Sequence, residues 1–143
     1  MAMSRRQVAK KYGFKSGLEK DVVDYLKSKG VDARYEEYHL PFVQPEKQRK
    51  YTPDVFVYNK QGELKYVIET KGRFTTDDRQ KMKWVKEQHP DIEFRLLFER
   101  DSAKLSKSSK TTYGKWSEKA KFIFNKFFRD KPVPDSWIED IER

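Results

Sequence analysis

The chain of 143 residues contains no cysteine and only two histidines, His39 and His89. The absence of cysteine excludes disulfide bridges, thiolate zinc sites and cysteine nucleophiles, and it is compatible with a reducing compartment. Two histidines are too few to favour a histidine-based metal cluster, so we expect surface or capping roles for both. Enzyme classes that depend on cysteine or on several histidines are therefore set aside.

Long hydrophobic runs are also missing. No window of the sequence approaches the roughly 20 consecutive apolar residues that span a bilayer, and no basic amphipathic segment carries the exposed large apolar groups of a membrane anchor. The first residues are too polar for a secretory signal. We therefore expect a soluble, cytoplasmic protein.

What the chain has in excess is positive charge. Its net charge is +9, and charged residues make up 38% of the sequence. This balance points to a polyanionic partner, with a solvated basic surface as the alternative explanation. The length suits one domain that can bury a core, and we find no internal repeat and no clear linker between separate domains.

Two acidic residues and a lysine stand in a pattern that is typical of metal-dependent nucleases. Asp54 follows Pro53, and after a gap of 14 residues comes Glu69, with Lys71 two positions later. Cutting a phosphodiester requires groups that hold a divalent metal ion against the phosphate and a group that stabilises the growing negative charge. Two carboxylates and a lysine meet these needs if they lie close together.

The apolar runs 55–58 and 64–68, separated by a turn-like segment, predict a β-hairpin. When the loop of such a hairpin has an even number of residues, Asp54 faces an odd-numbered residue such as Glu69. Asp54, Glu69 and Lys71 then share one face, with opposite or diagonal partners roughly 5 to 8 Å apart. An odd loop without a bulge would break this arrangement. The alternative explanation is that all three are exposed strand residues with no catalytic role.

A third carboxylate, Glu19, lies near the start of a predicted helix that Gly30 ends. Apolar residues recur at helical spacing here, at Leu18, Val22, Tyr25 and Leu26. Ser16 and Glu19 also form an S-x-x-E capping box, in which the glutamate returns to the N-cap amide. The local sequence favours this capping role, although a glutamate beside the buried stripe could reach a metal ion held on the sheet.

The basic residues concentrate in two segments. Residues 1–15 contain five basic residues and no acid, and residues 101–131 contain nine basic residues against three acidic ones. We interpret residues 1–15 as a flexible basic arm that orders on DNA, with a tail that has no binding role as the alternative. The candidate contacts to DNA phosphates are Arg5, Arg6, Lys10, Lys11, Lys15, Lys104, Lys107 and Lys110.

The order of the remaining elements supports an α/β fold with a mixed central β-sheet flanked by helices. In chain order we expect a strand at 33–43, a helix from Thr75 or Thr76 to about His89, a strand at 92–98, a polar loop at 101–111, a helix at 112–121 and a short helix from about Asp135. Met82 and Val85 should face inward. For a cluster of four phenylalanines we favour packing against the body over stacking on unpaired bases, namely Phe122, Phe124, Phe127 and Phe128.

Seven short motifs, in order and with similar spacing from Ser16 to Trp137, resemble phage-type endonuclease I. They are Ser16–Glu19, Tyr35–Tyr38, Tyr51–Asp54, Glu69–Gly72, Asp77–Arg79, Glu87–Pro90 and Thr112–Gly114. That family resolves four-way DNA junctions and belongs to the PD-(D/E)xK nuclease superfamily. The resemblance implies a structure-specific endonuclease with a restriction-endonuclease-like core, which cuts four-way (Holliday) and other branched junctions in pairs by metal-dependent hydrolysis.

The resemblance also implies roles for individual residues. Asp54 and Glu69 would bind Mg²⁺ or Mn²⁺, with two ions per active site, and the main-chain carbonyl of Thr70 would add a ligand. Glu19 would contribute to the second metal position, which reverses the preference for capping. Lys71 would be the catalytic lysine. The catalytic set is therefore Glu19, Asp54, Glu69 and Lys71.

A homodimer is the last implication of the resemblance. Residues 16–143 would form a single nuclease domain in which residues 16–44 are exchanged between subunits across a bridge at 45–50, so that both chains contribute to each active site. A simple surface connection is the alternative for 45–50. Two other functions remain open. One is a related nuclease that acts on linear or single-stranded DNA, and the other is a non-catalytic binder of branched DNA. If the source is a phage, the expected location is the host cytoplasm.

Overall fold

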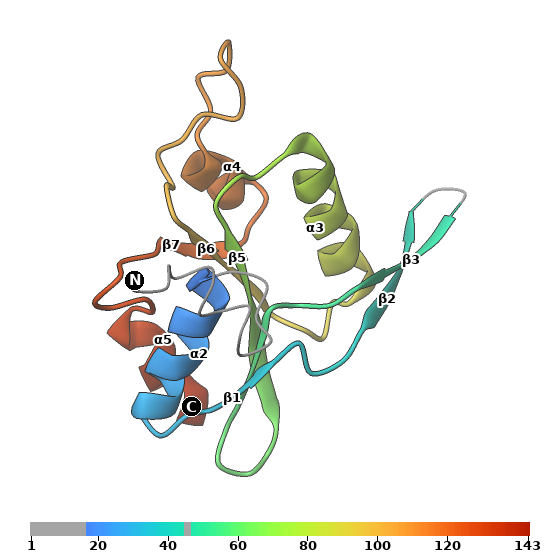
Figure 1. Ribbon diagram of the computed structural model, residues 1–143. Coiled ribbons are helices and arrows are strands. Elements are labelled where there is room, and N and C mark those ends of the chain that lie inside the picture. The colour runs from blue at the N-terminus through green and yellow to red at the C-terminus, as the bar shows by residue number, and fades with distance from the viewer. Residues whose placement is uncertain (1–16, 45–46) are drawn as a thin grey trace, which may run out of the picture.

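The computed structural model describes residues 17–44 and 47–143 (Figure 1). The predicted basic arm at residues 1–15 and the predicted capping residue Ser16 lie outside these ranges. Within them, no helix combines the length and the apolar character that crossing a membrane requires.

A five-stranded mixed β-sheet forms the centre of the fold (Figure 1). In spatial order its strands are β1 (Asp32–Tyr35), β4 (Val55–Tyr58), β5 (Leu64–Lys71), β6 (Phe94–Phe98) and β7 (Ile123–Lys126). The pairs β1–β4 and β4–β5 are antiparallel, whereas β5–β6 and β6–β7 are parallel. The predicted mixed central sheet is confirmed.

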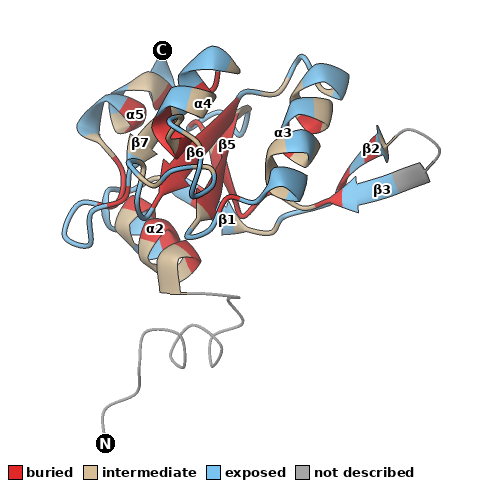
Figure 2. Cartoon of the chain, turned by 90° about the horizontal axis from the view of Figure 1, so that it is seen from above, coloured by how far each residue is buried: buried red, intermediate tan, exposed pale blue. Residues whose placement is uncertain are grey.

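Helices cover both faces of this sheet, as predicted (Figures 1 and 2). They are α2 (Gly17–Ser28), α3 (Thr76–Gln88), α4 (Tyr113–Lys119) and α5 (Asp135–Glu139), followed by the 3-10 helix η1 (Asp140–Glu142). Because side chains alternate along a strand, Val55 and Val57 of β4 pack with α2 and α5, while Phe56 packs with α3 and α4. The sheet thus separates two hydrophobic clusters, and its buried strands lie at the centre of Figure 2.

The β4–β5 hairpin sets the positions of the motif residues. Its register pairs Val55 with Ile68. Continued by one residue, the same register puts Asp54 opposite Glu69. Side chains at these positions face α3, because they alternate with residues that face α2. Lys71 is two residues further along β5 and therefore shares this face.

The loop of this hairpin is odd, because Tyr58 pairs with Leu64 and five residues lie between them. An odd loop alone would turn Glu69 to the opposite face of the sheet. Val57, however, pairs with Tyr66, so Lys65 is an extra residue that forms a β-bulge. The bulge restores the register, and the predicted alignment is reached by this route instead of through an even loop.

A second, two-stranded sheet stands beside α3 and consists of β2 (Leu40–Gln44) and β3 (Lys47–Tyr51). The single strand predicted at 33–43 is therefore wrong. The chain turns after β1, where Glu36 adopts a left-handed backbone conformation with φ 41°. The N–H of Glu36 donates to the carbonyl of Asp54 at 3.1 Å, which fixes this turn against the start of β4.

Within the segment 45–50, for which a bridge between exchanged parts was predicted, residues 47–50 belong to β3. Residues 45–46 lie outside the described ranges. A two-stranded ribbon accepts polar residues on its open face while its other face is buried. Among the ribbon side chains whose burial the structure describes, Leu40, Phe42 and Tyr51 are buried.

The helix predicted after the hairpin is confirmed as α3. Thr75 is its N-cap: the Thr75 hydroxyl accepts from the N–H of Asp78, and the Asp78 carboxylate accepts from the N–H of Thr75. This reciprocal pair satisfies two amides at the helix start. Met82 and Val85 are fully buried, as predicted, and His89 is the C-cap residue.

The short edge strand β7 has no counterpart among the predicted strands, because four residues carry too little alternation to be recognised. In the phenylalanine cluster, Phe122 and Phe127 are buried and Phe124 is partly buried against Phe98. The packing interpretation is confirmed for these three. It is wrong for Phe128, whose side chain is 49% exposed.

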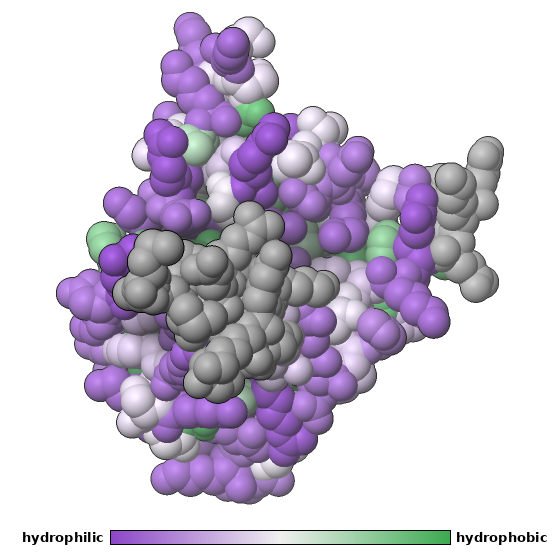
Figure 3. All heavy atoms as spheres, viewed as in Figure 1, coloured by the Kyte–Doolittle hydropathy of each residue, from purple (hydrophilic) through white to green (hydrophobic). Residues whose placement is uncertain are grey.

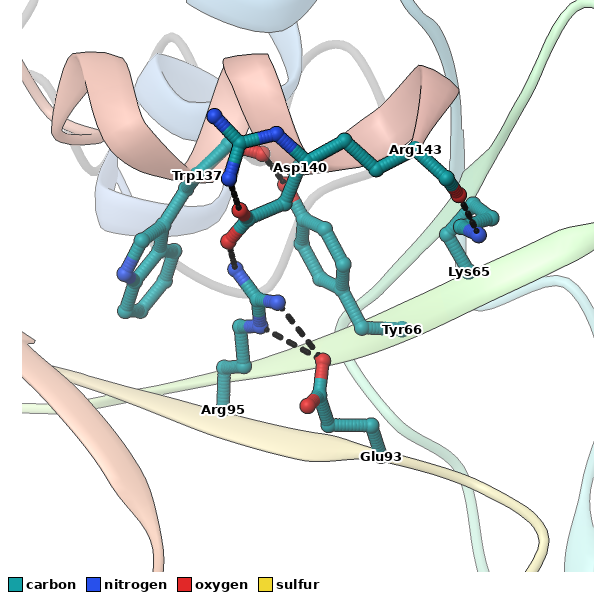
Figure 4. A network of polar contacts seen from close by, with 7 residues as sticks. All are labelled: Lys65, Tyr66, Glu93, Arg95, Trp137, Asp140 and Arg143. Atoms are coloured by element: carbon teal, nitrogen blue, oxygen red, sulfur yellow. Dashed lines mark hydrogen bonds and ion pairs between the residues drawn. The ribbon is translucent and has the colours of Figure 1, made fainter.

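A polar network fixes the C-terminal helices to the sheet (Figure 4). Arg95 of β6 is buried, donates to Glu93 at 2.6 and 2.9 Å, and donates to Asp140 at 3.1 Å. Its guanidinium lies 3.8 Å from the centre of the Tyr66 ring, a cation–π distance. The Tyr66 hydroxyl in turn donates to the carbonyl of Trp137 at 2.8 Å. One buried cation thus connects two strands with the end of the chain.

Candidate active site

The structure brings the predicted motif residues to one cavity of about 330 Å³, which side chains of both α2 and α3 help to line. Asp54 stands just before β4, and Glu69 and Lys71 stand at the end of β5. The other side chains that line the cavity come from α2, from β3 and the residue after it, from β5 and from α3: Glu19, Lys50, Tyr51, Thr52, Thr70 and Lys81. Residues from distant parts of the sequence therefore meet at this point.

Asp54 is held by its neighbour in the hairpin. One carboxylate oxygen, Oδ2, accepts from the main-chain N–H of Thr70 at 2.9 Å and from the Thr70 hydroxyl at 3.1 Å. Burial raises the pKa of Asp54 well above its usual range, the nearby charge of Glu69 raises it further, and the Thr70 hydrogen bonds oppose this only in part. The side chain is thus held in place, and a nearby cation would stabilise its ionised form.

Glu69 is buried next to Asp54, with 5% of its surface exposed. Burial raises the pKa of this carboxyl as well, although the Lys71 ammonium opposes the rise. Two buried carboxylates facing each other are costly unless a cation or a proton compensates them. A divalent cation bound by carboxylate oxygens would supply that compensation.

Lys71 is fixed by a residue that the sequence pattern assigned only to the helix dipole. Its Nζ lies 3.3 Å from Oδ1 of Asp78 in the first turn of α3. Burial alone would lower the pKa of Lys71, but the carboxylates of Glu69, Asp78 and Asp54 together raise it. The ammonium therefore stays protonated and acts as a fixed positive charge beside the carboxylates.

Glu19 lies in the first turn of α2 and is buried, with 6% of its surface exposed. The Tyr35 hydroxyl donates to Glu19 Oε2 at 3.1 Å. One carboxylate oxygen each of Glu19, Glu36 and Asp54 lies within 4.8 Å of the other two. Oxygen atoms at such distances can share one cation, because calcium-sized ions take oxygen ligands at about 2.3 to 2.6 Å and smaller ions at less. The donor set therefore fits a divalent metal ion.

Asp54 occupies a central position, because it belongs to both acidic groups. It faces Glu69 across the hairpin, and it approaches Glu19 and Glu36 on the other side. Sequence reasoning missed Glu36, which was noticed only within the motif Tyr35–Tyr38. No periodic pattern reveals it, since its position depends on the left-handed turn after β1.

Four more residues that line the cavity were missed as site residues, among them Tyr51 and Lys81; the other two are Lys50 and Thr52. Tyr51 is buried, and its pKa is raised by burial first and then by the charges of Glu69 and Asp54. Lys81 Nζ lies 5.2 Å from the centre of the Tyr51 ring. Helical spacing would have identified Lys81, because it follows Asp78 by three residues and therefore lies on the same face of α3.

The predicted DNA contacts do not line this cavity in the part of the chain that the structure describes. Lys104, Lys107 and Lys110 are exposed on a loop that projects beyond α4 (Figure 1). In the space-filling view this projection is largely hydrophilic (Figure 3). The other predicted contacts lie outside the described residues: Arg5, Arg6, Lys10, Lys11 and Lys15.

Comparison with known proteins places these features in a family. A family model described as phage endonuclease I matches residues 1–143. The chain is 40% identical over 127 residues to a protein named endodeoxyribonuclease 1 from Enterobacteria phage T3, covering 89% of this chain and 78% of the relative. It is 39% identical over 127 residues to endonuclease I from Escherichia phage T7, covering 89% and 79%. The chain therefore belongs to the phage endonuclease I family.

Proposed function

We propose that this protein is a metal-dependent endodeoxyribonuclease that resolves four-way (Holliday) and other branched DNA junctions by hydrolysing phosphodiesters in paired cuts. The observation that carries the proposal is the meeting of Asp54, Glu69 and Lys71 in one cavity of a chain from an endonuclease family. The net charge of +9 suits a polyanionic substrate. The mixed sheet with the motif on two paired strands supports a PD-(D/E)xK assignment.

We propose that the cavity holds Mg²⁺ or Mn²⁺, with two ions per site; the acidic group of Glu19, Glu36 and Asp54 supports a divalent cation. Asp54, Glu69 and the main-chain carbonyl of Thr70 would hold one ion, and Asp54 with Glu19 the other, where Glu36 adds a third carboxylate. When bound, such ions lower the pKa of a coordinated water and neutralise charge on the phosphate.

The chain itself supplies position and charge. The two hydrogen bonds from Thr70 fix the Asp54 carboxylate, and the Tyr35 hydroxyl orients Glu19. The Lys71 ammonium, fixed by Asp78, stabilises the negative charge that develops on the phosphate. Predicted contacts to more distant phosphates come from residues 1–15 and from the loop that carries Lys104, Lys107 and Lys110.

Resolving a junction needs two cuts in opposing strands, which favours two identical sites related by a twofold axis. We propose a homodimer that exchanges residues 16–44 across the segment 45–50. Within one chain, the exchanged segment brings Glu19 to the cavity and pairs β2 with β3. Exchange would form the same contacts between two chains, because the only covalent link between the two parts runs through residues 45–46. Each site would then take Glu19 from one chain and Asp54, Glu69 and Lys71 from the other.

Cleavage of a labelled four-way junction, beside linear duplex and single strands of the same sequence, tests the function. We expect paired, Mg²⁺-dependent cuts in the junction, no cuts in EDTA, and binding without cleavage by Glu69→Gln. Equal cutting of linear or single-stranded DNA would favour a nuclease of different specificity. Binding without cleavage under Mg²⁺ or Mn²⁺ would leave a DNA-binding protein.

Mixed dimers of Glu19→Ala and Glu69→Ala chains test the exchange separately. In an exchanged dimer, one site of the mixed species receives both substitutions and the other receives none. The mixture then nicks one strand of the junction, although each variant alone is inactive. Without exchange, every site carries one substitution and the mixture stays inactive. Subunits must be unfolded and refolded together before the assay so that they mix.

A further inference from the structure

A second cavity adjoins the candidate active site, between α3 and the β2–β3 ribbon. It has a volume of about 430 Å³ and shares Lys50 and Lys81 with the active-site cavity. We call it the flanking pocket and define it by the lining residues Phe42, Arg49, Lys50, Asp77, Lys81 and Trp84. The two shared lysines make the pocket a direct continuation of the site.

The chemistry of the flanking pocket suits a nucleotide. Arg49, Lys50 and Lys81 carry three positive charges against the single acid Asp77. Trp84 is partly buried against the core and lines the pocket, so its ring is both anchored and accessible. A groove of basic residues with an aromatic platform is a common arrangement for binding a single nucleic-acid strand. The volume lies within the roughly 300 to 1,000 Å³ of small-ligand sites.

The pocket is held in shape by contacts between its two walls. The side-chain amide of Gln88 at the end of α3 accepts from the N–H of Val43 at 2.5 Å and donates to the carbonyl of Val43 at 2.7 Å. These two hydrogen bonds satisfy the main-chain N–H and carbonyl of Val43, as a neighbouring strand would, and they fix the ribbon to α3. Lys81 is placed over the ring of Tyr51, at the boundary between the two cavities. A ligand would therefore enter a preformed space.

We propose that the flanking pocket binds the nucleotide next to the phosphate that is cut. Arg49 and Lys81 contact the phosphate of this nucleotide, and Trp84 stacks on its base after that base has left its pair at the branch. The inference rests on the proposed nuclease function and adds to it a reason for branch preference. A continuous duplex keeps its bases paired and must break a pair before a base can reach Trp84, whereas a branch point lowers that cost.

The test measures junction binding in a Glu69→Gln background, so that the DNA stays intact. We expect Trp84→Leu to weaken binding about tenfold on the complete junction. The position of the cut is first mapped with the wild-type enzyme. An abasic site at the nucleotide beside the cut should abolish the difference in affinity between Trp84→Leu and its parent, whereas an abasic site elsewhere should leave that difference unchanged. Trp84→Phe keeps an aromatic ring and should bind close to the parent. Equal losses with Trp84→Leu on all three junctions would overturn the stacking role.

Salt dependence tests the phosphate contacts. Arg49→Gln should reduce the slope of log binding constant against log salt by about one, on every junction. Lys60→Gln removes an equal charge from the exposed β4–β5 turn and should leave the slope unchanged. Equal slopes for these two variants would overturn the contact. If the wild type still cuts junctions in that case, the nuclease proposal stands and only the pocket fails. A wild type that neither binds nor cuts would overturn both.

Discussion

The Thr70 hydroxyl donates to the same Asp54 oxygen that accepts the Thr70 main-chain N–H, at 3.1 and 2.9 Å. One residue therefore fixes the Asp54 carboxylate through two bonds, and only one of them depends on its side chain. Partners of this kind orient metal ligands, and their loss typically costs 10- to 100-fold in metal affinity.

Thr70→Val should accordingly weaken Mn²⁺ binding about tenfold. Valine keeps the β-branched shape and the main-chain N–H, so the strand should remain intact. Titration calorimetry measures the affinity, and Thr70→Ser, which keeps the hydroxyl, is the matched control. Equal affinities for the valine and serine variants would show that the hydroxyl does not position Asp54.

Asp78 has two roles that can be separated by substitution. It caps α3 together with Thr75, and it fixes Lys71. Asp78→Asn should lower the cleavage rate about tenfold, because the ammonium loses a charged partner that orients it and raises its pKa. Thr75→Ala should cost about 1 kcal/mol of stability and leave the rate almost unchanged. Similar rates for both variants would assign Asp78 to capping alone.

Without metal, the buried carboxylates should destabilise the fold. Their pKa values are raised relative to the ordinary values of 3.8 for Asp54 and 4.5 for Glu69. These two groups cost the fold no stability well below about pH 4, where their carboxyls are protonated in the folded and in the unfolded protein. Stability is lost as the pH rises from the unfolded-state pKa values toward the higher folded-state values.

In EDTA at about pH 7.5, Glu69→Gln should therefore increase the free energy of unfolding by about 1 kcal/mol and raise the midpoint of thermal unfolding. The advantage over the wild type should shrink as the pH falls toward 4, and added Mg²⁺ should stabilise only the wild type. Calorimetry across this pH series measures all three effects. A variant less stable than the wild type in EDTA would contradict the expected strain.

The C-terminal network should contribute strongly to stability through Arg95. Arg95→Met removes a buried cation that pairs with Glu93 and Asp140 and lies over Tyr66. We expect a loss of about 2 to 3 kcal/mol in urea unfolding. This lies at or below the lower end of the roughly 3 to 5 kcal/mol for a broken buried pair, because both partner carboxylates remain partly solvated. Arg34→Met is the control: Arg34 also pairs with two carboxylates and lies over a tyrosine ring, but on the surface. A comparable loss in both variants would contradict the importance of burial.

The sequence was sufficient to predict elements with strong local signals. The sequence narrowed the cap of α3 to Thr75 or Thr76, of which the structure shows Thr75. The inward residues Met82 and Val85 and the hairpin of β4 and β5 followed from spacing alone. Strand alternation with an even loop predicted the meeting of Asp54 and Glu69. The structure reaches the same meeting through an odd loop and the bulge at Lys65, which the sequence did not reveal.

What the sequence could not reveal depends on contacts between distant segments. Glu36 joins the acidic group because of a left-handed turn that a non-glycine residue seldom adopts. The polar strand β3 forms because β2 offers an edge to pair with, and β7 forms because β6 offers one. Such elements are stabilised by tertiary pairing and not by their own propensity.

The extra residue Lys65 in β5 couples the chemistry to a turn at the far end of the hairpin. Inserting or deleting one residue in that turn would invert the side chains that follow, directing Glu69 and Lys71 into the apolar layer against α2, unless the bulge disappeared at the same time. Whether the number of residues between Asp54 and Glu69 is odd or even, together with the bulge, thus decides whether the two carboxylates share a face. Relatives whose turn is longer or shorter by an odd number of residues can keep Glu69 and Lys71 on this face only if the bulge changes as well.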